Sequence, residues 1–259
     1  MRLSEITLVF LDLAEYRKRT MPDTYYSSKL AAERLARCYD IAPPRVQQYL
    51  RAEIDFALDH IFQGDVVLDM GCGYGRAIPP LARKAGLVIG IDISLPSLRF
   101  GKPFLQGLFN CFLLEMDAAW MGFREGSFDA VLCIQNGISA FRMDPLLLIS
   151  EGLRVIRENG LFLISSYSEK FWEHRLEWFE LQAAEGLVGE IDRQKTGNGT
   201  IVCQDGFRAT TFTAHQFLAL ASKLDINANI TEVDESSLFC VIRKTAKDLL
   251  KKRQGRPPR

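Results

Sequence analysis

The sequence predicts an α/β fold: a doubly wound, mostly parallel seven-stranded sheet with an N-terminal helical cap and a β-rich insertion after the fifth strand. Two observations support this expectation. Short apolar runs alternate with segments of helical periodicity between residues 65 and 165, and strands that alternate with helices form parallel sheets covered on both faces. Further strand patterns separated by turn residues follow, and the last two are expected to close the sheet as an antiparallel hairpin.

The composition is that of an ordinary globular protein. The chain has 259 residues, 47% of them apolar and 25% charged, and its formal net charge is zero. A neutral chain has no long-range field that would attract nucleic acid or acidic lipid. No apolar run approaches the roughly 18 residues of a membrane-spanning helix, and we expect no signal peptide and no membrane contact. The six cysteines form no Cys-x-x-Cys pair, which argues against a metal site or a disulfide framework and favours a cytoplasmic location.

Residues 1–63 are expected to form the helical cap. Helical periodicity covers Lys29–Tyr39, and it resumes after Pro43 and Pro44 until Gln63-Gly64. Proline is tolerated in the first turn of a helix, so the second of these helices is expected to begin at the two prolines.

Residues 64–169 are expected to form the core, with five strands and the helices between them. The strands are Asp65–Met70, Leu87–Ile93, Cys111–Met116, Phe128–Ile134 and Leu161–Ser165. The helices are Arg76–Lys84, Pro96–Leu108 with an interruption near Gly101 and Pro103, and a helix from Pro145 to Arg157. Asp144 caps the last of these helices, and Asn159-Gly160 is a stop signal after it.

The remaining chain divides into an insertion, a return to the core and a basic tail, residues 246–259. The insertion, residues 170–213, contains an aromatic helix and three strand patterns: Lys170–Glu185, Val188–Asp192, Thr200–Cys203 and Phe207–Thr213. Residues 214–245 are expected to add a helix, which begins with a capping box at Thr213, and the closing hairpin of Ala228–Val233 and Leu238–Arg243.

A glycine-rich loop follows the first strand directly. Residues 66–76 read Val-Val-Leu-Asp-Met-Gly-Cys-Gly-Tyr-Gly-Arg. Glycine has no Cβ, so the backbone can turn sharply and a ligand can approach it closely, here at the carboxyl end of a strand and near a helix N-terminus. The Gly-x-Gly-x-Gly spacing differs from the Gly-x-Gly-x-x-Gly of dinucleotide folds. Another kind of nucleotide site, or a tight turn without a ligand, remains an alternative.

Acidic and polar residues stand at the ends of the strands that follow. Asp92 ends the second strand, 23 positions after Asp69, which is near the spacing of a carboxylate that binds two ribose hydroxyls. Asp117-Ala118 ends the third strand, Phe128-Asp129-Ala130-Val131 begins the fourth, and Gln135-Asn136-Gly137 ends it. In this order, these motifs resemble the class I S-adenosylmethionine-dependent methyltransferases over residues 64–166, and they imply a Rossmann-like fold.

The resemblance implies S-adenosylmethionine as cofactor, S-adenosylhomocysteine as product, and a role for each matching residue. Asp69 would hold the ammonium group of the cofactor or orient the loop. The other expected cofactor contacts are Gly71, Cys72 and Gly73 with the methionine part, Asp92 with the ribose, Ile93 with the adenine ring, Asp117 and Ala118 with the adenine amino group, and Gln135 below the sulfonium. Tyr25 and Tyr26 would contact cofactor or acceptor, unless they are surface turn residues, and Asp129 is expected to be structural.

The segment after the fifth strand supplies the candidates for acceptor chemistry. In the resembling family this region commonly lies beside the acceptor pocket, so His174 is the candidate general base, with a packed or solvent-facing histidine as the alternative. Trp172 and Trp178 would be pocket walls or core residues. Phe207-Arg208 would either anchor an anionic acceptor or lie exposed on a hairpin. The insertion is expected to form a β layer over the acceptor site or a homodimer contact.

The function that the resemblance favours is transfer of a methyl group from S-adenosylmethionine to a small-molecule acceptor by in-line displacement. An RNA or protein methyltransferase is the first alternative, but the fourth strand ends in Gln135-Asn136-Gly137-Ile138 instead of the Pro-Pro-aromatic motif of many base-modifying relatives. A non-catalytic S-adenosylmethionine-binding protein is the second alternative. A nicotinamide oxidoreductase is the third, and the glycine spacing argues against it.

Overall fold

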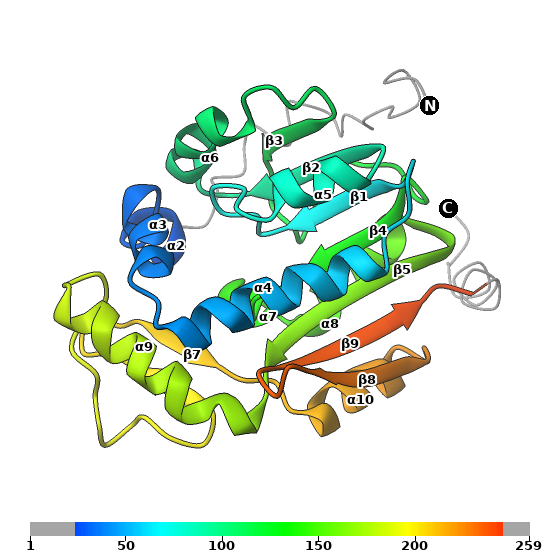
Figure 1. The fold of residues 1–259 in the computed structure, drawn as a ribbon. Helices are drawn as coiled ribbons and strands as arrows, with labels where there is room; N and C mark the ends of the chain where they lie inside the picture. Colours follow the sequence, from blue (N-terminus) through cyan, green and yellow to red (C-terminus); the bar gives the residue numbers. More distant parts are fainter. Residues whose placement is uncertain (1–23, 246–259) are drawn as a thin grey trace.

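A seven-stranded sheet forms the centre of the protein (Figure 1). The computed structural model describes residues 24–245, so the first 23 residues of the expected cap and the basic tail, residues 246–259, lie outside the described residues. The strands are β1 Val66–Met70, β2 Leu87–Asp92, β3 Cys111–Glu115, β4 Phe128–Cys133, β5 Ile156–Tyr167, β8 Ala228–Val233 and β9 Ser237–Arg243.

The strand order is β3-β2-β1-β4-β5-β9-β8. Strands β1 to β5 are parallel to their neighbours, whereas β9 runs antiparallel to β5 and β8 antiparallel to β9. The predicted α/β class, mostly parallel sheet and closing hairpin are therefore confirmed. The order reverses between β1 and β4, and the loops at such a reversal diverge and leave room for a ligand at the carboxyl ends of the strands.

Helices cover both faces of the sheet. On one face α4 (Pro44–Asp59) and α5 (Ile78–Lys84) pack against the sheet. On the other face lie α8 (Pro145–Val155) and α10 (Ala214–Lys223). Side chains of β1 alternate between the two apolar clusters, with Val66, Leu68 and Met70 in one and Val67 in the other, because successive side chains of a strand point to opposite faces. This burial on both faces explains why β1 begins with consecutive apolar residues, Val66 to Leu68.

The insertion and the cap share a third apolar cluster at the carboxyl ends of the parallel strands. In Figure 1, α2, α3, α9 and β7 lie together at the side toward which β1 and β4 point. Helix α9 (Trp172–Ala184) buries Trp178 and Phe179 there, against Tyr25 and Cys38 of the cap and Phe207 of the insertion. The remaining elements are α2 (Tyr25–Ser28), α3 (Glu33–Asp40), α6 (Leu95–Gly101), α7 (Gly137–Ala140), β6 (Thr200–Val202), β7 (Arg208–Thr210) and the short 3₁₀ helices Lys102–Leu105 and Glu169–Phe171. The expected domain boundaries stay predictions.

The predicted capping box of α10 is confirmed. The hydroxyl of Thr213 accepts a hydrogen bond from the backbone N–H of Gln216, and the side chain of Gln216 accepts one from the backbone N–H of Thr213. Both partners lie within one turn, so this element could be identified from local sequence. Among residues 24–245, every helix is too short or too polar to cross a membrane.

Several predicted elements are wrong in detail. The helix expected over Lys29–Tyr39 begins only at Glu33, as α3, and a separate short helix, α2, precedes it. Ala32, just before α3, has a φ of +52° and donates its backbone N–H to the hydroxyl of Ser97 on α6. Val188–Asp192 is not a strand and makes only an isolated bridge between Ile191 and Cys203. Helix α8 ends at Val155 rather than Arg157, because β5 already begins at Ile156.

Candidate active site

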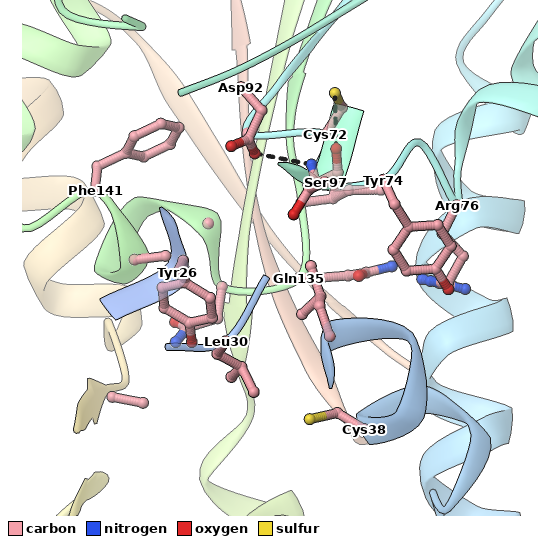
Figure 2. A pocket seen from close by; sticks show the side chains of 18 of the residues that line it. Tyr26, Leu30, Cys38, Cys72, Tyr74, Arg76, Asp92, Ser97, Gln135 and Phe141 are labelled. Carbon is pink, nitrogen blue, oxygen red and sulfur yellow. Dashed lines mark hydrogen bonds between the residues drawn. The ribbon is translucent and has the colours of Figure 1, made fainter. Parts of the chain in front are cut away.

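A cavity of about 330 Å³ opens at the carboxyl ends of the parallel strands (Figure 2). This volume lies in the usual range for small-molecule sites. The sequence-predicted cofactor residues that line it are Asp69, Gly71, Cys72, Gly73, Asp92, Ile93, Asp117, Gln135 and Tyr26. Ala118 is buried and does not line the cavity, whereas its neighbour Ala119 does. The topology therefore brings nine of the ten positions to one place, and their roles toward a ligand stay predictions.

The glycine loop is held open and close to the end of β2. The backbone N–H groups of Gly71 and Cys72 both donate to the carbonyl oxygen of Ile91, at 2.8 and 3.0 Å. Gly71 has a φ of +75° and Gly73 a φ of +58°, which is the left-handed region that side chains disfavour. A Cβ at Gly71 would also lie 3.0 Å from the ring of Phe141. Both properties explain why glycine is required here.

Asp92 connects β2 to this loop. One carboxylate oxygen accepts the backbone N–H of Gly73 at 2.9 Å, and the other accepts the backbone N–H of Ser94 at 2.8 Å. Figure 2 shows Asp92 next to Cys72 of the loop, with Tyr26 and Leu30 of the cap among the other side chains around the cavity. Each oxygen keeps a second lone pair for a ligand donor, so the carboxylate can hold the loop and a pair of hydroxyls at once.

Two opposite charges lie at the base of the loop. Asp69 is 3% exposed, and burial raises the pKa of its carboxyl to about 7, although the charge of Arg76 lowers it. The guanidinium of Arg76 lies 4.9 Å from the centre of the Tyr39 ring. Its Nε and one Nη are buried without a hydrogen-bond partner among the described residues. Sequence analysis missed Arg76, although its place directly after the third glycine could have indicated it.

A buried glutamate supports the loop after β4. Gln135 and Asn136 have φ angles of +57° and +59°, so the chain turns sharply there. Glu53 of α4, fully buried, accepts the backbone N–H of Gln135 at 2.6 Å and the hydroxyl of Ser237 at 2.7 Å. Burial raises the pKa of the Glu53 carboxyl to about 7. Sequence analysis missed this residue as well, and the signal was a charged side chain on the apolar stripe of a helix.

The raised pKa of Glu53 predicts a pH-dependent stability. The pKa of this carboxyl group is higher in the folded protein than in the unfolded chain. Its contribution to the free energy of unfolding is therefore largest at a pH below the unfolded-state pKa, and it is lost as the pH rises through the folded-state pKa. The melting temperature of the wild type should therefore fall between about pH 5 and about pH 8, and that of Glu53→Gln should fall less, because glutamine can accept the same N–H without a charge. Thermal unfolding monitored by circular dichroism measures this difference. Asp55→Asn, at an exposed position of α4, is the control, and identical pH profiles of wild type and Glu53→Gln would contradict the prediction.

The aromatic helix α9 brings some of its candidates into the cavity. Trp178 lines it, and the indole N–H donates to the carbonyl oxygen of Cys38 at 2.7 Å. His174 is exposed, has its ring 5.6 Å from that of Phe171 and does not line the cavity. The buried residues of α9 are Arg175, Trp178, Phe179 and Gln182. His174 comes one turn before Trp178 and lies at the exposed edge of this buried face. His174 is therefore not among the residues that the structure brings to the cavity, and its role as general base stays a prediction.

The other candidates from the cap and insertion have structural contacts. Trp172 is partly buried beside Arg175 and does not line the cavity. The hydroxyl of Tyr25 donates to Asp205 at 2.5 Å. Phe207 is buried, and Arg208 is exposed outside the cavity. Asp129 accepts the backbone N–H of Val66, as expected for a structural role. Within residues 24–245, no group of His, Cys, Asp or Glu side chains could hold a metal ion.

Comparison with known proteins agrees with this geometry. The sequence profile of a methyltransferase domain matches residues 67–160. Over 104 residues the chain is 31% identical to 2-methyl-6-phytyl-1,4-hydroquinone methyltransferase of Synechocystis sp. (strain ATCC 27184 / PCC 6803 / Kazusa). The aligned region covers 37% of this chain and 33% of the relative. Over 74 residues the chain is 40% identical to aklanonic acid methyltransferase DauC of Streptomyces sp. (strain C5), covering 27% and 34%. The chain thus matches about a third of the length of these relatives.

The fold is similar to solved structures over most of the chain. One is 1,6-didemethyltoxoflavin-N1-methyltransferase of Burkholderia thailandensis, with a TM-score of 0.57 and 15% identity, where the similarity covers 88% of this chain and 93% of that chain. At this identity the likeness concerns the fold, and the matching profile lies over β1 to β5, the part of the chain that carries the glycine loop.

Proposed function

Because this chain belongs to the class I S-adenosylmethionine-dependent methyltransferases, we propose that it transfers the methyl group of S-adenosylmethionine to a small-molecule acceptor by in-line displacement. The observation that carries the proposal is the position of Asp92. Its two carboxylate oxygens accept the backbone N–H groups of Gly73 and Ser94, and its side chain lines the cavity. A carboxylate at the end of β2 beside a glycine loop is suited to a ribose. S-adenosylhomocysteine would be the product.

The residues present fit this cofactor. The positive φ angles of Gly71 and Gly73 keep side chains away from the place where a ligand would pass, and the unpartnered N–H groups of Arg76 suit a carboxylate. Asp69 and the Gln135 loop would face the ammonium and sulfonium groups, and Asp117 with Ile93 would border the adenine. When bound, the sulfonium supplies an activated methyl group. The protein then needs chiefly to align the acceptor and to exclude water.

The surroundings of the cavity support a small acceptor. Cap residues Tyr26 and Leu30 and insertion residues Trp178 and Ala209 line it, so segments outside the sheet contribute to its wall. This supports the first of the two roles expected for the insertion, a layer over the acceptor site, and a homodimer contact stays a prediction. The relatives are named for a hydroquinone, for aklanonic acid and for 1,6-didemethyltoxoflavin, which are small molecules.

Calorimetric titration with S-adenosylmethionine, S-adenosylhomocysteine and NAD tests the cofactor. We expect micromolar binding of both adenosyl ligands and no binding of NAD, because the glycine spacing differs from that of dinucleotide-binding folds. Absence of adenosyl ligand binding would contradict the proposal. Turnover is then tested with labelled methyl donor and a panel of small acceptors, with total RNA as the comparison substrate. Labelling of RNA in preference to every small molecule would favour the alternative acceptor class.

A further inference from the structure

A group of lining residues comes from the cap, the end of β5 and α9, and not from the glycine loop. We call it the aromatic chamber and define it as Tyr26, Tyr49, Tyr167, Trp178, Phe179 and Gln182. The rings of Tyr49 and Tyr167 have centroids 5.3 Å apart, and those of Trp178 and Phe179 lie 5.8 Å apart. Rings that pack at such distances offer flat apolar surfaces, which favour a planar ligand.

Two buried polar groups of the chamber lack a hydrogen bond of good geometry among the described residues. Gln182 is 2% exposed, and its side-chain nitrogen has no hydrogen-bond partner among the described residues. Tyr49 is fully buried, and its hydroxyl makes no hydrogen bond of good geometry among the described residues, although it interacts with the hydroxyl of Tyr167. Buried polar groups in folded proteins are nearly always paired, and unpaired ones call for an explanation. Both groups can donate a hydrogen bond, so a ligand that carries an acceptor atom could accept from them.

A buried cation lies directly behind the chamber. Arg175 is 1% exposed, and its guanidinium lies 4.3 Å from the ring centre of Tyr167 and 5.8 Å from that of Phe179. Its hydrogen bonds go to the carbonyl oxygens of Gly199 and Ala209 and to the hydroxyl of Thr211. All three acceptors are neutral, and the Nε has no partner among the described residues. A buried charge without a counter-ion is unfavourable.

The acidic side chains nearby do not neutralise this charge. Among the described residues, the acids that line the cavity are Asp69, Asp92 and Asp117, all at the ends of the parallel strands. Glu53 lies on α4 one turn from Tyr49, but its oxygens accept from Gln135 and Ser237 and it does not line the cavity. The chamber side thus combines aromatic rings and hydrogen-bond donors with a positive charge.

We propose, on the basis of the proposed function, that the acceptor is a planar aromatic compound with an ionised or readily ionised oxygen, such as a carboxylate or a phenol. Gln182 and Tyr49 would donate to that oxygen, and Arg175 would favour its negative charge through the aromatic wall. Aromatic rings alone could also attract an ammonium group. Here Arg175 already occupies the face of Tyr167 and repels a second cation, so the chamber selects against amines.

Two probes of equal ring size test the proposal on the full-length protein, 2-naphthoate and 2-naphthylmethylammonium. Binding is measured by calorimetry with and without saturating S-adenosylhomocysteine. We expect naphthoate to bind at least about tenfold more tightly than the ammonium probe. Gln182→Leu and Tyr49→Phe should each weaken naphthoate binding by roughly three- to tenfold, and Arg175→Met should abolish the preference for the anion. Glu177→Gln, at an exposed position of α9, should bind both probes as the wild type does.

The outcomes separate this inference from the proposed function. Equal or tighter binding of the ammonium probe, failure of both probes to bind, or naphthoate binding that neither Gln182→Leu nor Tyr49→Phe weakens would each overturn it. These two variants decide the question if Arg175→Met does not fold, since each removes one polar group and keeps the size of the side chain. The proposed function fails independently if S-adenosylhomocysteine does not bind, because the probes are also titrated into the protein alone.

Discussion

Replacing Asp92 with alanine is expected to raise the dissociation constant for S-adenosylhomocysteine by between about tenfold and about a hundredfold, which is the range for loss of a charged hydrogen bond. The carboxylate accepts the N–H groups of Gly73 and Ser94 and lines the cavity. The substitution therefore removes a ligand contact and the anchor of the glycine loop together. Calorimetric titration measures the affinity, and a thermal unfolding curve shows whether the variant is folded.

Two companion variants sharpen this test. Asp92→Asn keeps the shape of the side chain and removes its charge, so its loss of affinity should be smaller than that of the alanine variant but still measurable. Asp55→Ala removes an exposed carboxylate from α4 and should leave the affinity unchanged. Wild-type affinity in a folded Asp92→Ala protein would contradict the assignment of Asp92 to the ribose.

Gly101→Ala is expected to lower the free energy of unfolding by about 3 kcal/mol, the upper part of the usual range for overpacking. A Cβ at this position would lie 2.1 Å from the carbonyl oxygen of Tyr74 and 2.8 Å from its carbon. These are backbone atoms of the glycine loop, so no side-chain rotation can relieve the contact. Helix α6 would have to move away from the loop, and cofactor binding should weaken with it. Denaturant unfolding measures the stability change.

The direction of the change is the informative part. Gly101 has the ordinary helical angles φ −72° and ψ −26°, and at such a position alanine normally stabilises a helix by about 0.5–1 kcal/mol relative to glycine. A stabilising effect would therefore show that α6 does not pack against the loop as closely as the structure indicates. Arg99→Ala, at an exposed position of the same helix, should change the stability by no more than about 0.5 kcal/mol.

Much of the cofactor side of the cavity could be predicted because its signals are local. The glycine loop is one continuous segment, and its position after β1 follows from the apolar run Val66-Val67-Leu68 at the start of that strand. Asp92 and Asp117 each come at the end of a predicted strand, and parallel strands bring their carboxyl ends to the same edge of a sheet. The capping box at Thr213 likewise depends on residues three positions apart.

The acceptor side depends on contacts between distant segments, so the sequence alone left open which of its candidates face the cavity. His174 and Gln182 lie on the same aromatic helix, but only Gln182 faces the cavity, since the direction of each side chain depends on how α9 packs against the cap. The expected cap helix begins only after Ala32, whose backbone N–H donates to the hydroxyl of Ser97, 65 residues away.

Local residue patterns were thus sufficient for the α/β class, the strand ends and the glycine loop of this protein. The tertiary structure alone decided that Glu53 supports the Gln135 turn, that Gly101 provides space for the backbone of the loop, and that Arg175 lies buried behind the aromatic chamber. The physical reason is that hydrogen bonds within a turn or a helix are encoded by neighbouring residues, whereas burial, close approach and charge compensation depend on segments that meet only in the folded chain.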